Sequence, residues 1–134
     1  MSVYVDHAKK LRAVTDPHYN CCQSVIVCFA KDAGLTEEKA FALASHFGGG
    51  MFRASACGAI TGGLMALGLL GAGDRDTLNE YYRILRERHD GYLDCADLLR
   101  VNKERGGEKK PHCDAMVYEC TALVEQLARE RGLL

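Results

Sequence analysis

The sequence predicts an all-α protein, a compact bundle of six or seven mostly short helices around a glycine-rich, apolar central helix. Three observations lead to this prediction. Residues that cap helices precede several apolar runs, as Asn20 does with Gln23 three positions later. Glycines follow such runs, as Gly34 does. The most strand-like stretch, residues 24–27, has no alternating pattern and no hairpin partner.

The first half of the chain divides into three expected helices. Residues 3–14 form a short amphipathic segment, which a turn-rich stretch closes. The Asn20 cap opens the second helix. Thr36 caps the third, because two glutamates follow it in the first turn, where the helix dipole favours acidic side chains. We expect this third helix to end at the triple glycine, residues 48–50.

The central helix is expected after Ser55, which is its predicted cap. Residues 56–73 carry no charge over eighteen positions, which reaches the lower limit for a membrane span. Six of these residues are glycine, so the hydrophobicity of the stretch is only moderate. We therefore expect a fully buried helix, which is also apolar on all sides, and no membrane span.

The second half of the chain contains three more expected elements. Residues 77–89 form a polar amphipathic helix, and Asp94 caps a short one. The charged stretch 102–110 contains two adjacent glycines and predicts an exposed loop. Pro111 suits the first position of the last helix. The length of the chain indicates one domain, so we expect a single cysteine-rich helical domain over residues 1–134.

The charge balance and the N-terminal residues limit the partners and the compartment. Seventeen basic and eighteen acidic residues give a net charge of −1, which does not indicate nucleic-acid binding. The first fourteen residues lack the apolar core of a signal peptide. We therefore expect a cytoplasmic protein, in which thiols stay reduced unless they are redox-active or bound to metal.

Four of the seven cysteines fall in the first turns of four expected helices: Cys21, Cys57, Cys95 and Cys113. A helix N-terminus carries about half a positive charge and several unpaired N–H groups, and both stabilise a thiolate. The pKa of a cysteine at such a position falls from about 8.5 toward about 3.5–7.5. The thiolate is the form that attacks disulfides and binds metals, so these four cysteines are the candidate site.

The other three cysteines give weaker signals. Cys28 and Cys120 lie seven residues after Cys21 and Cys113, and therefore in mid-helix. We expect both to be core residues, because a free cysteine packs as a small hydrophobic side chain. Cys22 points about 100° away from Cys21 on a helix of 3.6 residues per turn, and its role stays open.

The spacing of the cysteines matches no compact metal signature, since there is no Cys-x-x-Cys anywhere. A shared site has to be assembled by folding, with one ligand from each helix. The glycines at 48–50 do not form a phosphate-binding loop, because no Gly-Lys-Ser/Thr follows them. His112, next to Cys113, is an alternative ligand, but we expect it and His18 to be surface histidines.

At these cysteines the sequence resembles a family of redox-active proteins named for its cysteine pattern, C-GCAxxG-C-C. The second cysteine of that family lies in a Cys-Gly-Ala-x-x-Gly motif, which matches Cys57 in "CGAITG". The first matches Cys21 in "NCCQSV", the third Cys95 in "DCADLL" and the fourth Cys113 in "HCDAMV". The resemblance runs from about residue 19 to the last helix. It implies a redox role for the same four cysteines that the helix starts select, and none for the other three.

Three functions fit these observations. In the first, the four helix-start cysteines bind an iron–sulfur cluster for electron transfer, or another metal such as zinc. Gly49, Gly50 and Gly58 then let the backbone approach the cluster and donate N–H bonds to its sulfurs.

In the second, the protein is a thiol–disulfide oxidoreductase without metal. Cys57 is its nucleophile, and one of the other three cysteines resolves the mixed disulfide. In the third, a structural or partner-binding bundle, the cysteines are incidental and the central helix packs closely, as at a homodimer interface. The sequence identifies neither a substrate nor a redox partner.

Overall fold

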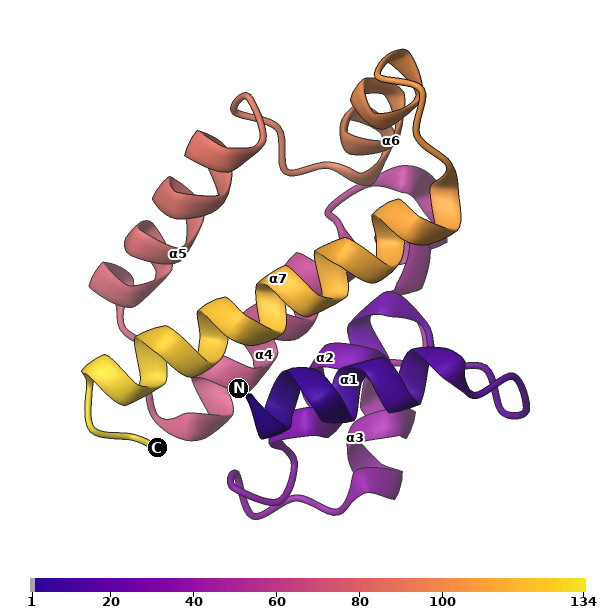
Figure 1. Ribbon diagram of the computed structural model, residues 1–134. Coiled ribbons are helices and arrows are strands. Elements are labelled where there is room, and N and C mark those ends of the chain that lie inside the picture. Colours follow the sequence, from indigo (N-terminus) through magenta and orange to yellow (C-terminus); the bar gives the residue numbers. More distant parts are fainter. Residues whose placement is uncertain (1) are drawn as a thin grey trace.

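The computed structural model describes residues 2–134, which are all-helical and contain no strand (Figure 1). The all-α prediction is therefore confirmed. Within these described residues, seven α-helices and one short turn, η1, follow one another. Their bounds are α1 (Val3–Ala13), α2 (Cys21–Phe29), α3 (Glu37–Leu43), η1 (Gly50–Ala54), α4 (Gly58–Leu70), α5 (Arg75–Arg88), α6 (Cys95–Glu104) and α7 (Lys109–Glu130).

The centre of the bundle is formed by α2, α4 and α7, which pack against one another. The long α7 crosses the molecule diagonally in Figure 1, with α5 on one side of it and α1, α2 and α3 on the other. Most residues of the glycine-rich α4 are buried or partly buried, which explains why the stretch carries no charge. Within residues 2–134, no helix is long and apolar enough to cross a membrane.

Two glycines of α4 allow its neighbours to approach closely. A Cβ atom at Gly62 would lie 2.7 Å from the carbonyl oxygen of Cys22 in α2, and one at Gly63 would collide with the hydroxyl of Tyr81 in α5. The buried Tyr81 hydroxyl donates a hydrogen bond of 3.0 Å to the carbonyl oxygen of Ile60. The glycines therefore position α4 against both helices.

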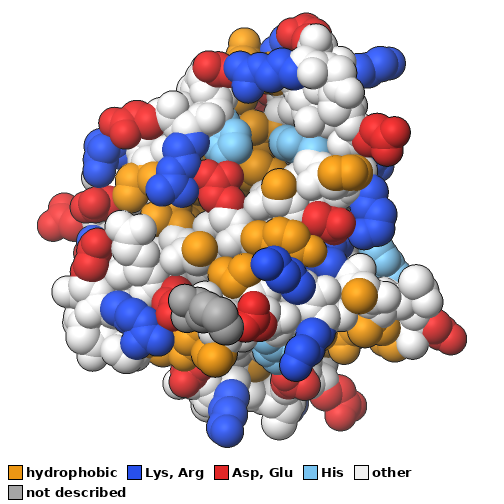
Figure 2. Space-filling view, in the orientation of Figure 1, with side chains coloured by type: hydrophobic (Ala, Val, Ile, Leu, Met, Phe, Trp, Pro, Cys, Tyr) orange, Lys and Arg blue, Asp and Glu red, His pale blue; other side chains and the backbone are white. Residues whose placement is uncertain are grey.

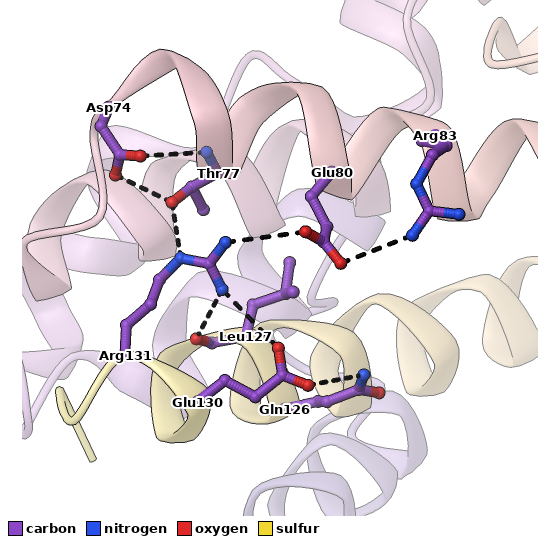
Figure 3. Close-up of polar contacts among 8 residues, drawn as sticks. All are labelled: Asp74, Thr77, Glu80, Arg83, Gln126, Leu127, Glu130 and Arg131. Carbon is purple, nitrogen blue, oxygen red and sulfur yellow. Dashed lines mark hydrogen bonds and ion pairs between the residues drawn. The ribbon is translucent and has the colours of Figure 1, made fainter.

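A polar network fixes α5 to the end of α7 (Figure 3). Asp74 caps α5 by accepting hydrogen bonds from the backbone N–H and the hydroxyl of Thr77, at 3.0 and 2.8 Å. The buried Thr77 hydroxyl in turn accepts a bond of 2.8 Å from Nε of Arg131. Arg131 also donates to the carbonyl oxygen of Leu127, at 3.1 Å. One arginine thus satisfies the last turn of α7 and the first turn of α5.

Local capping signals in the first half of the chain were predicted correctly. Asn20 and Gln23 form a full capping box at α2, and the Thr36 side chain accepts a hydrogen bond from Lys39 N at α3. Residues 24–27 are helical. The prediction that the third helix reaches the triple glycine was wrong. It ends at Leu43, because the Asn20 side chain binds the carbonyl oxygens that follow the helix.

Three predicted boundaries in the second half need correction. Helix α5 begins at Arg75 instead of residue 77, because Asp74 is its cap. Helix α7 begins at Lys109, two residues before the predicted start at Pro111. The predicted loop 102–110 is only four residues long, residues 105–108, because α6 continues to Glu104.

Candidate functional site

The four helix-start cysteines line one cavity of about 560 Å³. Cys21 and Cys95 are the first residues of α2 and α6, and Cys57 immediately precedes α4. Because α7 starts earlier than predicted, Cys113 lies in its second turn. Ser55, the predicted cap of α4, is replaced in that role by Cys57. Folding therefore brings together four thiols that are widely separated in the sequence.

Arg12 of α1 holds the Cys21 and Cys113 segments together. Its Nε donates a 2.7 Å hydrogen bond to the Asp114 carboxylate, and a terminal nitrogen donates one of 2.8 Å to the carbonyl oxygen of Tyr19. Asp114 is adjacent to Cys113, and Tyr19 lies two residues before Cys21. The Arg12 side chain is only 7% exposed, so this charged group is buried in the cavity wall. We call this arrangement the Arg12 clamp.

A two-residue backbone bridge holds the other two cysteines. Ala56 and Asp94 form an isolated antiparallel bridge. In it the Cys57 N–H donates to the Leu93 carbonyl oxygen at 3.1 Å, and the Cys95 N–H donates to the Ser55 carbonyl oxygen at 2.6 Å. Residues on either side of a bridged pair point to the same face, so Cys57 and Cys95 both face the cavity.

The three glycines expected to approach a ligand surround the cysteines. Gly49 and Gly58 line the cavity. A Cβ atom at Gly58 would lie 2.8 Å from the Phe47 carbonyl oxygen and 3.3 Å from the Cys21 Cβ. A Cβ atom at Gly50 would lie 2.9 Å from the Cys95 Cβ, so this glycine lets η1 pass behind Cys95.

The backbone of η1 is left-handed beside the cavity. Gly49, Gly50, Met51 and Phe52 have consecutive φ angles between 56° and 66°, and Ala54 has a φ of 57°. Left-handed backbone costs about 1–2 kcal/mol for each residue with a side chain. Phe52, although 69% exposed, lines the cavity. A strained segment with an exposed aromatic ring therefore borders the four thiols.

The pKa is raised at three of the four thiols, by burial at Cys57 and Cys95 and by the neighbouring Cys113 at Cys21. Desolvation raises the pKa of Cys57 to about 11, although the nearby backbone N–H groups of Ile60 and Ala59 favour its thiolate. Desolvation and the nearby Cys113 also raise the pKa of Cys95. The hydrogen bond to Cys113, together with burial, raises the pKa of Cys21. The prediction that helix starts lower the pKa of all four cysteines was therefore wrong for three of them.

Cys113 is the exception. A hydrogen bond from the Cys21 thiol, with the charges of Arg12 and Lys109, lowers the pKa of Cys113 to about 7 against the opposing effect of burial. The sulfur is partly exposed at the cavity. Within this pair the environment favours the thiolate on Cys113 and the protonated thiol on Cys21.

The other three cysteines lie outside the cavity wall. Cys28 and Cys120 are buried, as predicted for core residues, and Cys22 is buried as well. Burial raises the pKa of both Cys22 and Cys28 to about 12. Their thiols are therefore protonated at neutral pH.

The described side chains of the cavity do not form a ready metal site. Within residues 2–134, no group of three or more His, Cys, Asp and Glu side chains is placed to hold one. As positioned, the four thiols share a cavity but do not converge on a single ion.

The basic wall of this cavity was not predicted from the sequence. Arg12, Lys109 and Lys110 all line it, and no local pattern marks them in the sequence. His112, which is adjacent to Cys113, and His18, three residues before Cys21, line it too. His18 is exposed as predicted, whereas His112 is partly buried and burial lowers its pKa.

A smaller cavity of about 200 Å³ lies beside the first, and His112 lines both. The second cavity is bordered by α5, α6 and α7, where His89 pairs with Glu119 at 2.7 Å. Figure 2, drawn in the orientation of Figure 1, shows hydrophobic and histidine side chains together in the upper part of the molecule. The histidine beside Cys113 therefore connects the cysteine cavity to a second polar recess.

Comparison with known protein families matches residues 19–127 to the family described as "Putative redox-active protein (C_GCAxxG_C_C)". The matched region contains all four cavity cysteines. In this chain Gly58 stands between Cys57 and Ala59, whereas the printed GCAxxG order has none there. Comparisons with curated proteins and with solved structures found no match. The match covers most of the chain, which therefore belongs to this redox-active family.

Proposed function

We propose that the protein is a thiol–disulfide redox protein whose redox pair is Cys21 and Cys113. The observation that supports this most strongly is that both thiols line one cavity, where each shifts the pKa of the other. Two thiols on the wall of one cavity are placed to form a disulfide with limited rearrangement. The Arg12 clamp favours the pairing, because it ties the segment before Cys21 to the residue after Cys113.

The two thiols have different roles. Cys113, with a pKa near 7, attacks a substrate disulfide, because the thiolate is the nucleophile. Once Cys113 is part of a mixed disulfide, it has no thiolate to accept the hydrogen bond from Cys21. The largest influence that raises the Cys21 pKa is then gone. Cys21 loses its proton and attacks the Cys113 sulfur, which completes the intramolecular disulfide.

Cys57, the nucleophile expected from the sequence, is less suited to attack. Its side chain is buried, with 7% exposure, and its pKa is raised to about 11. At neutral pH only a very small fraction is thiolate. In this proposal Cys57 and Cys95 form the far wall of the cavity.

Mild oxidation with diamide, followed by thiol counting and peptide mass mapping, tests this function. We expect two of the seven thiols to disappear and a peptide pair linked through Cys21 and Cys113. Replacing either residue by Ser should abolish the linkage. Cys95→Ser is the matched control, because it alters the same cavity and should leave the linkage intact. A product linked through other cysteines, or no disulfide, would contradict the proposal.

An iron–sulfur cluster is the second candidate, and it is favoured by one observation: four cysteines line one cavity. The residues that would hold the cluster are Cys21, Cys57, Cys95 and Cys113, and the cluster would supply one-electron chemistry. The thiols as positioned do not form a ready ligand set, which places this candidate second. Purification without oxygen, with iron, acid-labile sulfide and visible absorption measured, tests it. A colourless, metal-free protein with reactive thiols would rule it out.

A further inference from the structure

We infer that the cysteine cavity takes a small, negatively charged disulfide as its substrate. This inference rests on the proposed thiol–disulfide function and specifies its substrate class. It is carried by the composition of the cavity wall, which is basic and apolar around the attacking thiol.

The charged residues that line the cavity are all basic: Arg12, Lys109 and Lys110. No Asp or Glu lies among the lining residues, although the chain as a whole has a net charge of −1. Asp114 pairs with Arg12 and Lys110, which offsets part of this charge. Lys109 lies close enough to favour the thiolates of both Cys95 and Cys113. The wall therefore keeps a positive excess beside the reacting sulfur.

The size and the apolar lining of the cavity limit the substrate further. A volume of about 560 Å³ lies within the range of about 300–1,000 Å³ that is typical of small-molecule sites. Phe52, Leu98 and Met116 contribute apolar surface next to the thiols. Such a wall suits a disulfide with short aliphatic arms that end in carboxylates, which reach the lysines.

The reaction balances without another component. The Cys113 thiolate attacks one sulfur of the substrate, its S–S bond breaks, and one thiolate leaves and takes a proton from water. Cys21 gives its proton to water and attacks the Cys113 sulfur of the mixed disulfide, which releases the second thiolate. The protein dithiol is oxidised to a disulfide, and the substrate disulfide is reduced to two thiols. The basic wall offsets the repulsion between the Cys113 thiolate and an anionic substrate.

A charge series of small aliphatic disulfides tests the inference. The probes are 3,3′-dithiodipropionate (anionic), bis(2-hydroxyethyl) disulfide (neutral) and cystamine (cationic). Cys21→Ser traps the mixed disulfide on Cys113, whose formation is followed by mass spectrometry. At low salt we expect the anionic probe to react about tenfold faster than the cationic one, and the difference to shrink as salt is added.

Two pairs of lysine substitutions distinguish the effect of charge in the cavity wall from the effect of the protein's net charge. Lys109→Gln with Lys110→Gln should slow every probe, because the Lys109 charge favours the Cys113 thiolate, and should slow the anionic probe about threefold to tenfold more than the neutral one. Lys31→Gln with Lys39→Gln, which removes two exposed lysines that do not line the cavity, should change neither rate. Equal, salt-independent rates for all three probes would overturn the inference and leave the proposed function standing. No mixed disulfide with any probe would overturn the proposed function itself.

Discussion

The guanidinium of Arg12 lies 2.7 Å from the carboxylate of Asp114, and the two side chains are only 7% and 20% exposed. A largely buried pair behaves differently from a surface pair, because the loss of one partner leaves a buried charge uncompensated. This pair also fixes the position of the residue next to Cys113.

Arg12→Gln should therefore lower the free energy of unfolding by about 3 kcal/mol. It should also raise the pKa of Cys113, because the Arg12 charge favours that thiolate. Urea denaturation and the pH dependence of alkylation measure the two effects. Arg83→Gln removes an exposed arginine that also pairs with carboxylates, and should change stability by less than about 0.5 kcal/mol. Equal effects of the two substitutions would contradict a structural role for the clamp.

The pH dependence of alkylation should identify Cys113 as the first thiol to react. Its folded pKa is lowered from 9.0 to about 7, so its thiolate forms as pH rises through about 7. The iodoacetamide rate of the native protein should be half-maximal near that pH, and Cys57, with a pKa of about 11, should react far more slowly. Cys113→Ser should remove the fast phase, whereas Cys95→Ser should retain it. A half-maximal rate near pH 9 would refute this assignment.

Two glycines of α4 should respond in opposite directions to alanine. Gly58→Ala places a Cβ 2.8 Å from the Phe47 carbonyl oxygen and should cost about 1–3 kcal/mol of stability. Gly68 is exposed, and a Cβ there meets no atom within 4 Å. Gly68→Ala should therefore stabilise the protein by about 0.5–1 kcal/mol, because alanine favours a helix. Thermal unfolding of both variants tests the close approach of α4 to α2.

Two buried threonines should also show opposite changes in stability when each is replaced by valine. Thr77→Val removes the hydroxyl that joins Asp74 to Arg131 and should cost about 1–3 kcal/mol. In the part of the chain that the structure describes, the buried hydroxyl oxygen of Thr121 has no hydrogen-bond partner. Thr121→Val should therefore be neutral or stabilising by about 1 kcal/mol. Destabilisation of similar size by both changes would argue against the network in Figure 3.

The left-handed backbone of η1 predicts that a glycine in place of Phe52 stabilises the protein. Phe52→Gly should raise the free energy of unfolding by about 0.5–1 kcal/mol, because the ring is mostly exposed and the φ of 56° suits glycine. The neighbouring Arg53 is also exposed, but its φ is not left-handed. Arg53→Gly should cost about 0.5–1 kcal/mol. The denaturation midpoints of the two variants test this prediction. A loss of stability at both positions would contradict backbone strain at Phe52.

Features that depend on neighbouring residues were predictable from the sequence. The capping box of Asn20 and Gln23 spans one helical turn, and the absence of charge in residues 56–73 follows from burial of α4. Both are local consequences of hydrogen bonding and of the hydrophobic effect. The choice of four cysteines also came from local signals, because each was expected near a helix start.

Features that depend on distant residues could not be predicted. Arg12 and Asp114 are 102 positions apart, and no local pattern distinguishes this arginine from exposed ones. The pKa order of the thiols depends on burial and on neighbouring groups, such as Arg12 and Lys109 beside Cys113, and only packing brings these together. Met51 and Phe52 adopt a left-handed backbone that side chains disfavour, so propensity points away from the observed turn.

The cavity draws its wall from both ends of the folded region, with Arg12 in α1 and Met116 in α7. Contacts between such distant positions require closure of nearly the whole chain, which carries an entropy cost. A partly synthesised or partly unfolded chain therefore has the separate cysteines but not the activated pair. Fast alkylation of Cys113 near neutral pH then reports completed folding through a residue that the protein already contains.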